Sequence, residues 1–225
     1  MVTQQTLHNI KQNCLHHKIE NYSINFDGSI DVDDNVELLS RNLSILPLKF
    51  RRVMGNFNVQ NNFLKTLENA PLSVGGNFNC FNNLLINFIG GPNWVGGDFY
   101  AYHNKLISLQ GSPAEVVGNY YISDNQSLTN LVGSTLKIGA DFSFDDVTCT
   151  YSGDEDIEFL GNFFLNETNY GKFSVNKLSS EIINNREHLK LILKYQRYFQ
   201  IWNEDLTFNG ENFNDLILEI KEGLQ

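Results

Sequence analysis

The stretch GGNFNCFNNLLINFIGGPNWV, residues 75–95, is one complete copy of a unit that recurs along the chain. Its proline, Pro92, lies 21 residues after Pro71 and 21 residues before Pro113. The aromatic residue of each unit keeps the same step, at Phe57, Phe78, Phe99 and Tyr120. A fixed period of this length is typical of a solenoid, in which each copy forms one coil.

Positions within the unit are numbered here from the aromatic residue as zero. In the unit that starts at Phe78, apolar residues occupy positions 0, 2, 7 and 10, and position 5 is Asn83. Positions 0 and 2 point to the same side of a strand, so the pattern predicts one short strand per coil. The asparagine predicts a turn whose side chain hydrogen-bonds backbone groups of the neighbouring coil. The pattern extends back to Val36 and loosens after Tyr120.

Glycine recurs two positions before the aromatic residue, at Gly55, Gly76, Gly97, Gly118 and Gly161. A recurring glycine indicates either a backbone with positive φ or a close approach of another segment. The repeat alone leaves both interpretations open.

Helical patterns flank the repeats. Residues 4–18 place Leu7, Ile10 and Cys14 on one helical face. After the repeats, Asn184 is predicted as a helix N-cap with Glu187 in the capping-box position, and a second amphipathic helix is predicted from about Glu211. These helices are expected to cap the open ends of the stack. A separate partner-binding or dimerising role for the C-terminal helices is the alternative.

The predicted fold is therefore an α+β solenoid of about six coils, with a parallel concave sheet and helical caps at both ends. The expected segments are an N-terminal helical cap over 1–27, the solenoid over 28–175, and a C-terminal helical cap over 176–225.

The unit also resembles a known family. Phe-x-Cys-x-x-Asn-x-Leu-x-x-Phe, from Phe78 to Phe88, resembles the leucine-rich-repeat core L-x-L-x-x-N-x-L-x-x-L. The fuller pattern of residues 75–95, with the lead-in of residues 21–50, is similar to leucine-rich-repeat-like proteins of tailed phages and other large DNA viruses. The resemblance implies a leucine-rich-repeat-like stack and a viral protein that modulates a host protein, such as a defence factor, in the host cytoplasm.

The formal net charge is −10, and Lys49, Arg51 and Arg52 form only a small basic cluster. Nucleic acid is therefore not an expected partner. Acidic residues group at 27–37 and 154–158, which favours a solvated surface over the alternatives of a Ca²⁺ site or a nucleic-acid mimic. With no signal-peptide pattern and no apolar run of spanning length, we expect a cytoplasmic protein without a membrane partner.

Sequence motifs of catalysis are absent. There is no G-x-S-x-G, phosphate loop, H-E-x-x-H or dinucleotide fingerprint, so the sequence predicts a non-enzymatic protein without a cofactor. Cys80 and Cys149 occupy core positions and are expected to be buried thiols. No pair of cysteines has C-x-x-C spacing, so no metal site is predicted.

The candidate binding residues lie where strand side chains should point outward, at positions 1 and 3. They are Phe81, Tyr100, Tyr102 and Tyr121, with His103 at the border and Ser123 beside them. Contiguous exposed aromatic side chains usually mark an interface, although C-terminal helices that cover them would be a structural explanation. The pattern favours a protein-binding module on the concave face. Carbohydrate binding or adhesion through stacked tyrosines is the alternative, and the partner's identity and the oligomeric state stay open.

Overall fold

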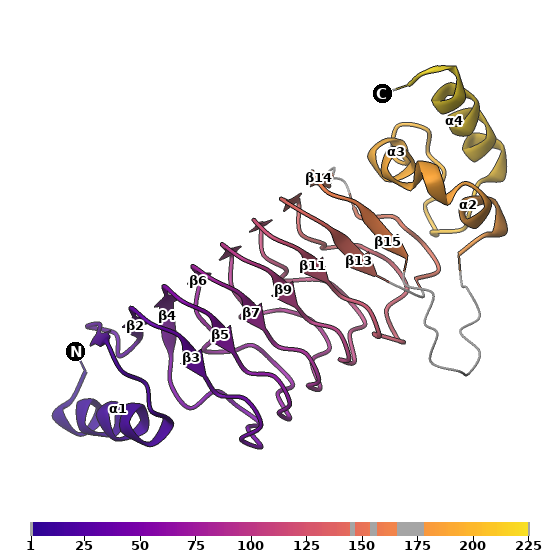
Figure 1. Ribbon diagram of the computed structural model, residues 1–225. Coiled ribbons are helices and arrows are strands. Elements are labelled where there is room, and N and C mark those ends of the chain that lie inside the picture. Colours follow the sequence, from indigo (N-terminus) through magenta and orange to yellow (C-terminus); the bar gives the residue numbers. More distant parts are fainter. Residues whose placement is uncertain (1, 145–146, 154–156, 166–177, 225) are drawn as a thin grey trace.

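The computed structural model describes residues 2–144, 147–153, 157–165 and 178–224. Within these residues the chain forms a parallel β-solenoid of about six turns, with helices at its two ends. Figure 1 shows the coils stacked one after another between helix α1 and helices α2–α4. The solenoid predicted from the 21-residue period is confirmed.

Each described coil contributes two very short strands, which build two separate sheets. Sheet A has the order β1 (Tyr22–Ile24), β2 (Ile30–Val32), β4 (Phe50–Val53), β6 (Ser73–Val74), β8 (Trp94–Val95), β10 (Glu115–Val116), β12 (Lys137–Ile138), β14 (Glu158–Phe159). Sheet B has the order β15 (Phe163–Leu165), β13 (Phe142–Phe144), β11 (Tyr120–Tyr121), β9 (Phe99–Tyr100), β7 (Phe78–Asn79), β5 (Phe57–Asn58), β3 (Val36–Glu37). All strand pairs are parallel except β1 with β2.

The strand register follows the sequence period. Phe57 pairs with Phe78, Phe78 with Phe99, and Phe99 with Tyr120. Tyr120 then pairs with Phe142, one residue beyond the regular step. The inserted residue after Tyr120 is therefore absorbed outside the strands, and the ladder continues unbroken.

Sheet A was not predicted, because the sequence pattern indicated one strand per coil. The second strand occupies positions 16 and 17, as in Ser73–Val74, where Val74 is buried and Ser73 is partly exposed. A strand of two residues is too short to show a period of two in the sequence. The described coils contain no helix, so the helices of this fold stand only at its ends.

An aromatic column runs through the core along sheet B. The rings of Phe57 and Phe78 stack with centroids 5.5 Å apart, and those of Phe78 and Phe99 with centroids 5.2 Å apart. Phe99 and Tyr120 continue the column at 5.4 Å. These four side chains are fully buried, and the Tyr120 hydroxyl lies 2.8 Å from Ser112 Oγ. Each coil thus buries its apolar face against the next, as a solenoid requires.

The asparagines at position 5 bind the neighbouring coil as predicted. Asn83 Nδ2 donates to Val59 O of the preceding coil at 2.9 Å and to Cys80 O of its own coil at 3.1 Å. Its Oδ1 accepts from Leu64 N at 3.0 Å. The same bonds recur at Asn62, Asn104 and Asn125. This ladder satisfies backbone groups that the turn would otherwise leave buried and unpaired.

Replacing Asn83 by alanine is expected to cost about 1–3 kcal/mol of unfolding free energy, because the buried Leu64 N loses its acceptor and the Val59 and Cys80 carbonyls each lose one donor. Asn58, which is partly exposed on the outer side of sheet B, donates to Glu37 Oε2 at 2.9 Å. Its replacement by alanine should cost no more than about 0.5 kcal/mol. Chemical denaturation of the two variants tests the register, which equal losses would contradict.

The recurring glycines mark close approach and not positive φ. Gly97 has no positive φ, and a Cβ there would overlap Asn77 Oδ1 and lie 3.0 Å from Asn77 N of the preceding coil. Only glycine therefore allows the coils to approach at this corner.

The N-terminal helix α1 spans Gln4–His17, as predicted. Its buried residues Ile10, Cys14 and His17 face the core. The segment 1–27, predicted as an N-terminal helical cap, also contains the strand β1, which the sequence pattern did not indicate. Cys80 and Cys149 are buried as predicted, and burial raises the pKa of the Cys149 thiol to about 11.

The C-terminal part contains α2 (Ser180–Asn184), a 3₁₀ turn (Arg186–His188), α3 (Leu189–Tyr195) and α4 (Gly210–Glu222). The prediction that Asn184 is an N-cap was wrong, because Asn184 is the last residue of α2 and the next α-helix begins only at Leu189. The N-cap of α2 is Ser179, whose hydroxyl accepts from Ile182 N at 3.3 Å. The second predicted helix begins within one residue of Glu211. The expected boundary between 175 and 176 lies outside the described residues.

Candidate binding face

The candidate residues come from three adjacent strands of sheet B and the residues that follow them. Tyr100 and Tyr121 end β9 and β11, and Phe81 and Tyr102 lie two residues after β7 and β9. All four side chains are partly exposed. The aromatic rings expected to share one surface do share it, and together they are called the aromatic face below.

The four rings form two stacked pairs. Phe81 and Tyr102 stack with centroids 4.4 Å apart at an angle of 12°, and Tyr100 and Tyr121 with centroids 5.2 Å apart at 9°. Tyr100 and Tyr102 meet edge-on at 6.4 Å and join the pairs. The inner ring faces are therefore turned toward one another, and the rings pack as a preorganised unit.

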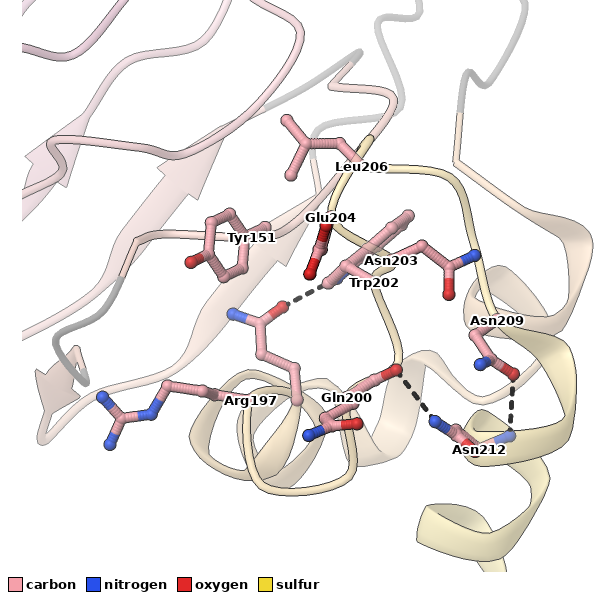
Figure 2. A pocket seen from close by; sticks show the side chains of 10 residues that line it. Tyr151, Arg197, Gln200, Trp202, Asn203, Glu204, Leu206, Asn209 and Asn212 are labelled. Carbon is pink, nitrogen blue, oxygen red and sulfur yellow. Dashed lines mark hydrogen bonds between the residues drawn. The ribbon is translucent and has the colours of Figure 1, made fainter.

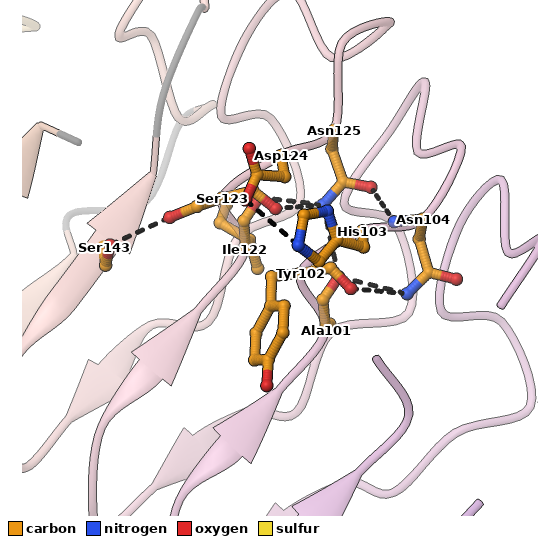
Figure 3. A network of polar contacts seen from close by, with 9 residues as sticks. All are labelled: Ala101, Tyr102, His103, Asn104, Ile122, Ser123, Asp124, Asn125 and Ser143. Carbon is orange, nitrogen blue, oxygen red and sulfur yellow. Dashed lines mark hydrogen bonds and ion pairs between the residues drawn. The ribbon is translucent and has the colours of Figure 1, made fainter. Parts of the chain in front are cut away.

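Ser123 does not belong to the exposed surface, contrary to the prediction. It is 4% exposed, and its hydroxyl lies 2.9 Å from the Ser143 hydroxyl, which is 2% exposed. Both side chains are therefore buried, and Figure 3 shows the contact between them.

His103 borders the aromatic face as predicted, and its ring contacts that of Tyr102 edge-on at 5.4 Å. Its Nε2 lies 3.5 Å from Asp124 Oδ2 in the next coil (Figure 3). Both residues have positive φ, at the position that Asn61 and Asn82 occupy in earlier coils. Asparagine, aspartate and histidine are the residue types enriched in this left-handed conformation, so the turn accepts His103 and Asp124 in place of asparagine.

A second polar ladder, one position before the aromatic residue, was missed by the sequence analysis. At each step an Oδ1 accepts from the backbone N–H of the equivalent residue one coil later: Asn35 from Asn56, Asn56 from Asn77, Asn77 from Asp98, Asp98 from Asn119, Asn119 from Asp141 and Asp141 from Asn162. The recurrence of asparagine or aspartate at this step was the signal available in the sequence.

Asp98 connects this ladder to the aromatic face. Its Oδ1 accepts from Asn119 N at 2.7 Å, while its Oδ2 accepts from the Tyr100 hydroxyl at 2.7 Å. Burial and the bond to Asp98 raise the pKa of Tyr100 well above its usual range. Burial, and then the charges of Asp98 and Asp141, raise the pKa of Tyr121. The tyrosine hydroxyls therefore remain protonated donors.

The described C-terminal helices do not cover the aromatic face. Figure 1 shows α2–α4 beyond β14 and β15, away from β7, β9 and β11. They contact the last coils instead, where Gln196 Nε2 donates to Thr150 O at 3.0 Å. Lys190 Nζ lies 4.9 Å from the centroid of the Phe159 ring.

A cavity of about 420 Å³ lies between the last described coils and these helices, lined by Tyr151, Gln196, Arg197, Gln200, Trp202, Asn203, Glu204, Leu206, Asn209 and Asn212 (Figure 2). Gln196 Oε1 accepts from Trp202 Nε1 at 3.0 Å and from Thr150 Oγ1 at 2.8 Å. Asn212 Nδ2 donates to Gln200 O at 3.0 Å. The bond from Thr150 joins the C-terminal part to the solenoid, and the other two bonds lie within the C-terminal part.

Comparison of the chain with protein-family models, with curated proteins and with solved structures finds no match. In the part of the chain that the structure describes, no helix is long and apolar enough to cross a membrane. No three histidine, cysteine or acidic side chains lie together as a metal site in those same residues. The fold class that the geometry supports is a parallel β-solenoid.

Proposed function

We propose that this protein is a non-enzymatic protein-binding module that uses the aromatic face of sheet B. The observation that carries the proposal is the joining of Phe81, Tyr100, Tyr102 and Tyr121 into two stacked ring pairs on adjacent strands. Rigid tyrosines supply contact area at a low entropic cost and are enriched in the centres of protein interfaces. His103 and Asp124 would then form part of the polar rim.

The finer fold assignment belongs to the same proposal. We infer that the coil is a leucine-rich-repeat-like unit in which a second short strand takes the place of a helix, and that α1 and α2–α4 act as caps. The buried face of α1 and the bonds of Gln196 to Thr150 support the capping role. The resemblance to phage proteins supports a viral protein that modulates a host protein, such as a defence factor, in the host cytoplasm.

Carbohydrate binding is the second candidate, since tyrosine rings serve as platforms for sugars. A platform needs an open ring face. The nearly parallel pairing of Phe81 with Tyr102 and of Tyr100 with Tyr121 covers one face of each ring with its neighbour. Each stacked pair therefore offers fewer open ring faces than two separate rings would, and this arrangement favours a protein partner.

Two capture experiments on the whole chain separate the candidates. One uses the immobilised chain to capture proteins from a bacterial lysate, with identification by mass spectrometry, and the other applies the labelled chain to a glycan array. We expect a protein that the variant Tyr100→Ala/Tyr102→Ala fails to capture. A glycan signal that this variant loses, without any protein that depends on the tyrosines, would replace the proposal by the carbohydrate alternative.

A further inference from the structure

The outer surface of sheet B carries charges of almost one sign. Positions −1 to 4 of the coils, as far as the structure describes their side chains, form what is called here the sheet B strip, comprising residues 35–40, 56–61, 77–82, 98–103, 119–124, 141–144 and 162. The chain has 16 lysine and arginine residues, yet none of them lies in the strip. His103 is its one basic side chain, against several carboxylates. The strip is therefore an anionic surface that includes the aromatic face.

Three carboxylates of the strip have only neutral donors as hydrogen-bond partners in the described residues. Asp98 accepts from Asn119 and Tyr100, Asp141 from Asn162, and Glu37 from Asn58. On the sheet A side, by contrast, carboxylates have cationic partners.

There Lys49 Nζ lies 2.8 Å from Asp27 Oδ2, and Arg51 pairs with Asp31. The chain thus pairs carboxylates with its own cations on one side, whereas Glu37, Asp98 and Asp141 have only neutral hydrogen-bond donors among the described residues.

The charges at 98 and 141 are not needed for the ladder that these residues join. Asn56, Asn77 and Asn119 make the same backbone bond with a neutral amide. A carboxylate at these positions adds a negative charge without adding a ladder bond. The two charges lie in alternate coils, with Tyr121 in the coil between them.

We propose that the partner bound by the aromatic face presents arginine or lysine side chains, which pair with Asp98 and Asp141 while their alkyl stems lie along Tyr100 and Tyr121. This inference rests on the proposed function and names the chemistry of the partner. Carboxylates flanking aromatic rings suit a guanidinium, which forms charge-assisted bonds and packs against ring surfaces. Charge complementarity would also accelerate association and make binding depend on salt.

The test selects binders of the immobilised whole chain from a randomised dodecapeptide display library. We expect selected peptides to be enriched in arginine and lysine. A selected peptide, resynthesised with citrulline in place of arginine, should bind at least about tenfold more weakly, because citrulline keeps the shape and removes the charge.

The double variant Asp98→Asn/Asp141→Asn should lose about tenfold or more in affinity for the same peptide, while the ladder is kept by the amides. The matched control is Asp215→Asn/Glu219→Gln, which removes two charges from exposed positions of α4 and should change affinity by less than about twofold. Unfolding transitions of both double variants report that the fold is intact.

The outcomes separate the two proposals. If the selected peptides are neutral and their binding requires Tyr100 and Tyr102, this inference is wrong and the proposed function still stands. Basic peptides that bind the Tyr100→Ala/Tyr102→Ala variant unchanged would overturn both. If the double variant and the α4 control lose equal affinity for the peptide, the effect comes from net charge alone and the inference is wrong. A library that yields no peptide rich in arginine or lysine would also overturn it.

Discussion

Replacing Phe99 by alanine is expected to cost about 3–5 kcal/mol of unfolding free energy. The Phe99 ring lies at the centre of the aromatic column, 5.2 Å from the Phe78 ring, 5.1 Å from that of Phe88 and 5.4 Å from that of Tyr120. It is fully buried, so its removal leaves a cavity between coils that pack only against their neighbours. A loss of this size is a large part of the 5–15 kcal/mol that typically holds a domain folded.

The matched control is Phe63→Ala, because Phe63 is 52% exposed. The same substitution should there cost less than about 0.5 kcal/mol. Urea denaturation followed by circular dichroism measures both changes. A loss at Phe99 no larger than that at Phe63 would contradict the packing of the column.

The stack of coils was predictable because its period is long and its spacing is strict. Phe57, Phe78 and Phe99 pair in the register that the 21-residue step requires. Asn83 makes the hydrogen bonds to the neighbouring coil that its position predicted. In both cases the residue type recurs because every coil has the same buried site for a ring and the same turn to hydrogen-bond.

Sheet A escaped prediction for a physical reason. Its two-residue strands from β6 to β14 offer only one buried residue each, such as Val74 or Val95, which a sequence pattern cannot distinguish from a buried loop residue. Asn184 was misplaced as a cap because it is the last residue of α2, while the predicted helix, α3, begins at Leu189 without a side-chain capping bond. A capping-box pattern of four residues cannot show that a separate short helix precedes it.

The positions of the aromatic rings in the candidate site could be predicted from the sequence, whereas those of the polar residues around them were less predictable. Strand alternation placed Tyr100, Tyr102 and Tyr121 outward, and the structure brings them together. The structure does not expose Ser123, which alternation could not predict, because alternation gives the side of a strand on which a side chain lies and not its burial. The link from Asp98 to the Tyr100 hydroxyl joins two repeat positions whose roles differ, so no single period could reveal it.

Replacing Tyr100 and Tyr102 together by alanine is expected to weaken binding of the natural partner by a factor on the order of 10³. Tyr100 stacks on Tyr121, and Tyr102 stacks on Phe81, so the double change breaks both ring pairs at the centre of the aromatic face. Each central aromatic anchor of an interface typically contributes about 2 kcal/mol or more when truncated. The column beneath is untouched, and the cooperative unfolding transition should persist.

Trp94 provides the matched control, since it is an aromatic residue of β8 on sheet A and is 36% exposed. Trp94→Ala should leave partner affinity within about twofold, because its side chain belongs to the opposite sheet from the aromatic face. Titration of the captured partner by isothermal calorimetry, with unfolding curves for each variant, makes the comparison. If the folded double variant binds as tightly as the parent while Trp94→Ala weakens binding, the interface lies on sheet A, and the assignment of sheet B as the binding face is wrong.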